Sequence, residues 1–151
     1  MWDWFGDSRL VSLHYHGLTR FMDTTIAMCG KVPSPVAVHG GSTKCGFYGD
    51  WSSPLSRFAS TKQTGQQVSS FFLILQLDAM VYLAESTPIQ DVVRATRYRA
   101  LASQAGLDFD MSYWNDTLLT FGSDSKFIQL YSVLGLHLQV GALSRRAQVA
   151  S

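Results

Sequence analysis

The chain has 151 residues and a mass of 16.8 kDa, which fits one domain that can bury a core without disulfides or metals. A formal net charge of +1 and a pI of about 7.8 exclude a strongly basic, free-standing nucleic-acid binder, although a filament subunit needs to neutralise only a few phosphates. Charged residues reach only 15%, against roughly 25% in ordinary soluble domains, so other chains are expected to cover part of the surface. We predict a single helical domain over residues 1–151.

The first predicted element is a helix that follows Asp7 or Ser8, either of which can cap it, and stops near Gly30. Its apolar spacing predicts this inward face: Val11, His14, Tyr15, Leu18, Phe21, Met22 and Thr25. His14 and His16 alternate as metal ligands on strands do. Residues two apart on a helix point to different sides, so we expect no metal site there.

The segment from Lys31 to Ser60 is rich in glycine and proline, which predicts turns and short strand-like pieces. Strand signals are confined to this insert. Cys29 and Cys45 form no CxxC pair, so we expect reduced thiols rather than a zinc site.

The next helix is predicted around Thr64 to Glu85, where apolar residues lie on almost every side, so it should be buried nearly all round. "STP" at Ser86 to Pro88 offers a cap followed by proline, and predicts a third helix from there to Gly106. The short connection favours antiparallel packing of the two helices.

After Gly106 the sequence predicts a polar and aromatic connection with possible helical turns. A last helix, capped by Ser123 or Asp124, then ends near Arg145 and Arg146. The run from Phe127 to Leu143 is too short and too polar for a membrane span, and we interpret it as a buried helix. The predicted fold is all-α: an antiparallel four-helix bundle with an irregular Gly/Pro-rich insert after the first helix.

Signals of catalysis are weak. The sequence has no G-x-S-x-G motif and no recognisable triad. Asp108 and Asp110 could form the carboxylate pair of a glycosidase if they faced a sugar cleft, but we favour a solvated loop for them. We therefore predict no enzyme, no catalytic residue, no cofactor, no metal and no small-molecule substrate.

The arginines of "DVVRATRYRAL" are the strongest candidates for binding. Arg94 and Arg97 share one helical face, Arg99 is turned away, and Tyr98 offers a ring beside them. Guanidinium groups in this arrangement can hold phosphates while a tyrosine stacks on a base. The alternative is a solvated face whose arginines pair with Asp91 or Glu85.

"SPLSRF", from Ser53 to Phe58, resembles a signature of coat proteins of rod-shaped plant RNA viruses, the tobamovirus and benyvirus type. In that family a Ser-Pro, a short spacer and an Arg-Phe precede the first long core helix. The resemblance implies a four-helix bundle that stacks into a helical rod around single-stranded RNA, located in the virion and the host cytoplasm.

The same resemblance implies roles for individual residues. Arg94, Arg97 and Arg99 would contact RNA, and Arg57 and Phe58 would be structural. Three carboxylates would face the inner radius of the rod and loosen the assembly as they ionise: Asp108, Asp110 and Asp116.

The leading hypothesis is thus a self-assembling capsid protein that packages RNA through backbone contacts. The alternative is a small accessory subunit of a large organellar or membrane complex. A soluble enzyme or ligand-binding bundle ranks last.

Overall fold

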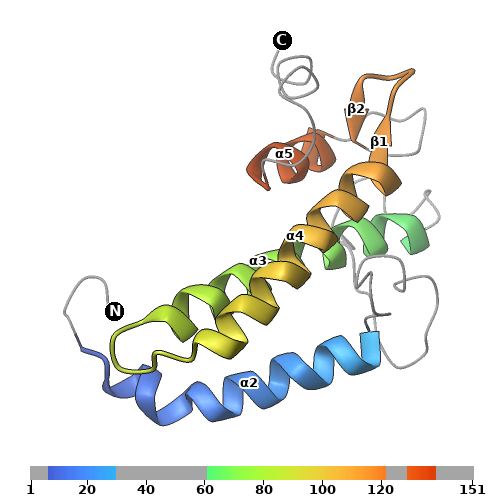
Figure 1. Cartoon of the computed structure of the whole chain (residues 1–151). Helices are drawn as coiled ribbons and strands as arrows, with labels where there is room; N and C mark the ends of the chain where they lie inside the picture. Colours follow the sequence, from blue (N-terminus) through green and yellow to red (C-terminus); the bar gives the residue numbers. More distant parts are fainter. Residues whose placement is uncertain (1–6, 30–60, 122–128, 139–151) are drawn as a thin grey trace.

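The computed structural model describes residues 7–29, 61–121 and 129–138 (Figure 1). In chain order the elements are α2 (Arg9–Cys29), α3 (Thr61–Glu85), α4 (Val92–Tyr113), β1 (Trp114–Asn115), β2 (Thr120–Phe121) and α5 (Gln129–His137). Within these ranges the chain is mostly helical, with one small two-stranded sheet. The insert predicted between the first two helices lies outside the described residues. The single-domain organisation of residues 1–151 stays a prediction.

Helices α3 and α4 run antiparallel, side by side, and form the central hairpin of the fold (Figure 1). The short connection in the sequence predicted this packing. The start of α4, however, was placed too early: the helix begins at Val92, not at Ser86. The reason is a stronger cap, because Oδ1 of Asp91 accepts the backbone N–H of Arg94 at 3.0 Å.

Helix α2 covers the half of this hairpin that is nearest the turn between α3 and α4 (Figure 1). Its buried side chains follow a spacing of four, three and four residues: Tyr15, Thr19, Met22 and Ile26. The expected inward face was therefore partly wrong, since Phe21 is 61% exposed and Leu18 is also exposed. Likewise α3 is not buried all round, because Phe72 and Tyr82 are about half exposed.

Helix α4 continues past Gly106 to Tyr113 and is followed at once by the hairpin β1–β2, in which Trp114 pairs with Phe121. A connection with possible helical turns was expected after Gly106, but α4 continues unbroken to Tyr113. Strands were expected only in the insert, and this expectation was wrong. Gly106 and Phe109 are buried within α4, so packing against α3 extends the helix beyond the glycine.

The core divides into two clusters along the α3–α4 hairpin. The first joins α2 to the hairpin: Tyr15, Met22, Ile26, Leu73, Leu77, Met80, Val81, Ala84, Ala95, Tyr98 and Ala102. The second joins α5 and β2 to the other half: Phe71, Ile74, Ala105, Phe109, Tyr113, Phe121 and Leu134. Because α2 and α5 belong to different clusters, the structure does not confirm a four-helix bundle. None of the helices in the described ranges is long and apolar enough to cross a membrane.

Candidate functional site

Polar side chains gather at two places among the described residues. One group lies between α2 and the first half of α4. The other lies where α4 ends and the β1–β2 hairpin begins. Either group could supply the carboxylates that a catalytic site would need.

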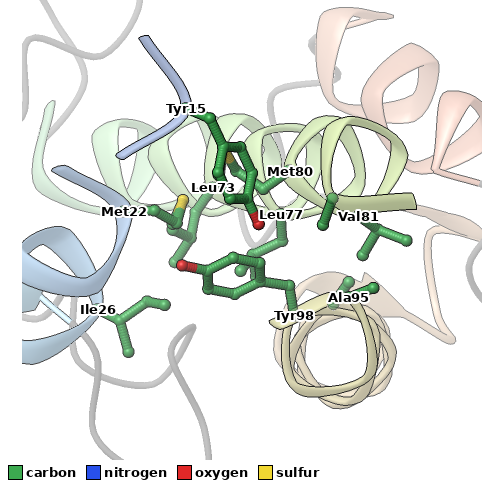
Figure 2. Packing of buried hydrophobic residues seen from close by; sticks show 11 residues of the cluster. Tyr15, Met22, Ile26, Leu73, Leu77, Met80, Val81, Ala95 and Tyr98 are labelled. Atoms are coloured by element: carbon green, nitrogen blue, oxygen red, sulfur yellow. The ribbon is translucent and has the colours of Figure 1, made fainter. Parts of the chain in front are cut away.

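The first group joins α2 to the first half of α4, and we call it the joint. In it, a tyrosine of each helix donates a hydrogen bond to an aspartate on the other side. The Tyr15 hydroxyl donates to Oδ2 of Asp91 at 3.2 Å, and the Tyr98 hydroxyl donates to Oδ1 of Asp23 at 3.0 Å. Figure 2 shows both tyrosine rings in the space between α2 and the hairpin, close to Met22 and Leu77. Burial and the neighbouring aspartates raise the pKa of each tyrosine to about 12, so both hydroxyls stay donors.

The arginines of α4 are paired with carboxylates. Arg94 contacts Asp91 at 2.9 Å, Arg97 contacts Asp23 at 2.8 Å, and Arg99 pairs with Glu85 on α3. Arg94 and Arg99 thus pair with the two carboxylates that the alternative from the sequence named, whereas the partner of Arg97 was not foreseen. Arg97 also lies 5.8 Å from the centre of the Tyr98 ring, in cation–π range.

The two carboxylates of this joint accept hydrogen bonds from arginine and tyrosine side chains. Hydrogen bonds from the backbone and side chain of Arg94 lower the pKa of Asp91 below its ordinary range. Asp23 accepts bonds from both Tyr98 and Arg97. We assign this joint a structural role, because hydrogen bonds between the helices already occupy its carboxylates.

At the far end of α4, Asp108 is only 8% exposed. Gln104, one turn earlier, donates Nε2 to Oδ1 of Asp108 at 3.0 Å, and Oδ2 has no hydrogen-bond partner among the described residues. Asp110 is half-buried on the same helix. Both aspartates therefore lie on a helix, which corrects the solvated loop expected for them. Two residues apart on a helix, they point to different sides and do not form a facing pair.

The β1–β2 hairpin brings a third carboxylate beside an aromatic ring. The indole N–H of Trp114 donates to Oδ1 of Asp116 at 2.8 Å, and the Trp114 ring meets Phe121 edge-on with centroids 5.2 Å apart. Phe109 continues this aromatic group from α4, 5.9 Å from Phe121. Asp116 is exposed. The end of α4 thus places an accessible carboxylate next to a half-exposed indole.

The remaining sequence-based candidates are placed as follows. Arg57 and Phe58 lie outside the described residues. His14 and His16 are exposed on α2, and no group of three or more potential metal ligands occurs in the described ranges. Sequence reasoning missed the Tyr15–Asp91 and Tyr98–Asp23 bonds, since partners more than 70 residues apart leave no local pattern.

Comparison with known proteins identifies a family. The family model described as the bacterial alpha-L-rhamnosidase 6 hairpin glycosidase domain matches residues 1–151. No curated protein and no solved structure matches the chain.

This match corrects the functional hypotheses drawn from the sequence. The resemblance to plant-virus coat proteins, carried by a short stretch around "SPLSRF", is wrong. The capsid function, the RNA partner, the helical homo-oligomer and the virion or host-cytoplasm location are wrong with it. The accessory-subunit alternative receives no support. The prediction that the protein is no enzyme and has no small-molecule substrate is also wrong, because the family is one of glycoside hydrolases.

The residue roles that followed from the coat-protein resemblance lapse with it. These are the RNA contacts of Arg94, Arg97 and Arg99 and the assembly function of Asp108, Asp110 and Asp116. The family model matches the full length of the chain, whereas the coat-protein signature was a short stretch before α3. The protein belongs to the family of bacterial alpha-L-rhamnosidase 6 hairpin glycosidase domains.

Proposed function

We propose that the chain takes part in hydrolysing α-L-rhamnosides and that the sugar meets it at the end of α4 and the β1–β2 hairpin. The observation that carries the proposal is the match of the glycosidase family over residues 1–151. The local chemistry supports it, since this end combines carboxylates with an accessible indole. Sugar sites need both: polar groups for hydroxyls, and apolar surface for the ring face.

Glycoside hydrolysis requires two carboxyl groups with different tasks. One protonates the oxygen of the leaving group, and the other activates a water molecule or attacks the sugar carbon. Asp23 and Asp91 fit neither task well, because arginine and tyrosine donors already hold their oxygens. The candidates that remain near the aromatic end of α4 are Asp108, Asp110 and Asp116.

Exposure separates these three candidates. Asp116 is open to solvent and can meet a sugar directly, while its bond from the Trp114 indole fixes its orientation. Asp108 is buried, and Gln104 holds one of its oxygens. We assign substrate contact to Asp116 first, and treat Asp110 and Asp108 as groups to be tested beside it.

The test is hydrolysis of 4-nitrophenyl α-L-rhamnopyranoside by the purified chain and by three variants, Asp108→Asn, Asp110→Asn and Asp116→Asn. Loss of a carboxyl group that transfers a proton is expected to lower kcat by roughly 10²-fold or more. Asp78→Asn is the matched control, because Asp78 is an exposed aspartate on α3 and not part of the proposed site at the end of α4 and β1–β2. Its activity should equal that of the wild type.

A binding measurement separates recognition from turnover. L-rhamnose should change the fluorescence of Trp114, and a Trp114→Phe variant identifies that contribution among the four tryptophans. If the wild-type chain neither hydrolyses the rhamnoside nor binds rhamnose, the proposal is contradicted. Hydrolysis that none of the three variants reduces would move the site away from the end of α4.

A further inference from the structure

The loop of the β1–β2 hairpin presents two leucines to solvent. Leu118 is 44% exposed and Leu119 is 46% exposed, at a position where polar turn residues are more usual. They lie in the four-residue loop that joins Asn115 to Thr120. Two adjacent apolar side chains at a loop tip beside the proposed sugar site are suited to contact an apolar part of a ligand, because binding residues often lie on loops.

The backbone keeps Leu119 in an unfavourable conformation. Its φ is 52°, in the left-handed region that glycine and asparagine adopt far more easily than leucine. Backbone strain of this kind gathers at functional sites, so a leucine at this position points to a use for its side chain.

The loop is also held in one shape by its neighbours. Oδ1 of Asn115 accepts the backbone N–H groups of Thr117 and Leu118 at 2.9 and 3.0 Å. Below the loop, Trp114 packs against the buried ring of Phe121. The two leucines therefore lie on a loop whose conformation is fixed, next to the Trp114 indole and the exposed carboxylate of Asp116.

The structure of L-rhamnose indicates which part of the sugar suits the leucine side chains. L-rhamnose is 6-deoxy-L-mannose, so the two sugars differ only at carbon 6, which is a methyl group in rhamnose and a hydroxymethyl group in mannose. A methyl group is favoured against leucine side chains, whereas a hydroxyl placed there loses hydrogen bonds to water. The other hydroxyls of the sugar are common to both, and suit a carboxylate such as Asp116.

We propose that Leu118 and Leu119 form the surface that recognises the C6 methyl group of rhamnose and discriminates against the hydroxymethyl group of mannose. This inference rests on the proposed function and adds a specificity element to it. The two leucines contact the substrate and take no part in proton transfer. Their loss therefore changes the choice of sugar more than the chemical step.

The experiment compares kcat/KM for 4-nitrophenyl α-L-rhamnopyranoside and 4-nitrophenyl α-L-mannopyranoside. An apolar site distinguishes such a pair by about 10- to 100-fold. Leu118→Ser, Leu119→Asn and the double variant should bring this ratio close to one. Asparagine suits the positive φ at position 119, so the loop keeps its shape when the apolar group is removed. Leu107→Ser is the control, because Leu107 is equally apolar and 62% exposed on α4.

The outcomes distinguish the two proposals. If the wild type hydrolyses the rhamnoside and the loop variants keep its preference, the specificity inference is overturned and the proposed function stands. A preference lost equally in Leu107→Ser would also overturn the inference. If the wild type hydrolyses neither glycoside, the proposed function fails and the inference fails with it.

Discussion

The hydroxyl of Tyr15 lies 3.2 Å from Oδ2 of Asp91, across 76 positions of the sequence. The same carboxylate accepts the backbone N–H of Arg94, so it both caps α4 and bonds α2 to the start of that helix. The Tyr98–Asp23 bond repeats the arrangement with the roles of the helices exchanged. This joint fixes α2 on the α3–α4 hairpin.

Removing the hydroxyl in Tyr15→Phe is expected to lower the free energy of unfolding by about 1 kcal/mol, because the bond runs to a charged group but is only partly buried. A double-mutant cycle with Asp91→Asn, followed by urea unfolding, measures the coupling directly. Tyr15→Phe combined with Asp78→Asn serves as the control pair and should be additive. Additivity of Tyr15→Phe with Asp91→Asn would show that the bond contributes nothing.

Asp91 and Asp78 are expected to affect the pH dependence of stability in opposite directions. Hydrogen bonds from Arg94 lower the pKa of Asp91 below 3.8, so its contribution is present above that pH and is lost as the pH falls through the lower, folded value. Asp78 is exposed as a residue, but partial burial of its carboxyl group raises its pKa, so the folded state is penalised once the pH rises above 3.8. Asp91→Asn should therefore destabilise the protein at pH 7, and Asp78→Asn should stabilise it slightly. Thermal unfolding between pH 3 and pH 7 measures both, and parallel curves for wild type and Asp91→Asn would contradict the assignment.

Asp108→Asn should behave differently from Asp91→Asn at neutral pH. Oδ2 of Asp108 is buried without a hydrogen-bond partner among the described residues, whereas both oxygens of Asp91 are bonded. Asparagine has the same shape as aspartate and retains the acceptor for Gln104, so the substitution changes only the buried oxygen that has no hydrogen-bond partner among the described residues. We expect Asp108→Asn to unfold at an equal or higher urea concentration than the wild type. A loss of more than about 1 kcal/mol would indicate a charged partner for Asp108.

The sequence predicted the parts of the fold that depend on local pattern. The apolar spacing around Phe71 to Leu83 located α3, and the short connection after it predicted the antiparallel hairpin with α4. The end of α4 was missed because Gly106 looks like a helix stop, and only its burial in the folded protein explains why the helix continues. Strands β1 and β2 have two residues each, too few for an alternating pattern to be visible.

The candidate site was only partly accessible from sequence. Asp108 and Asp110 were considered as a glycosidase pair, and the family now supports the general chemistry while their spacing on α4 argues against a facing pair. Asp116 was singled out for a different role. The contribution of Trp114 and the leucine loop depends on a hairpin that the sequence did not predict.

Two glycines provide a matched test of the packing at opposite ends of the molecule. A Cβ added at Gly135 in α5 would lie 2.3 Å from Cδ2 of Phe121, whose ring is buried and cannot move aside, whereas at Gly17 in α2 it would meet nothing within 4 Å. Gly135→Ala is therefore expected to destabilise the protein by about 1–3 kcal/mol through overpacking. Gly17→Ala should stabilise it by about 0.4–1 kcal/mol, because alanine favours the helix and restricts the unfolded chain. Urea unfolding of both variants measures the two effects, and a Gly135→Ala protein as stable as Gly17→Ala would show that α5 does not pack on β2 as described.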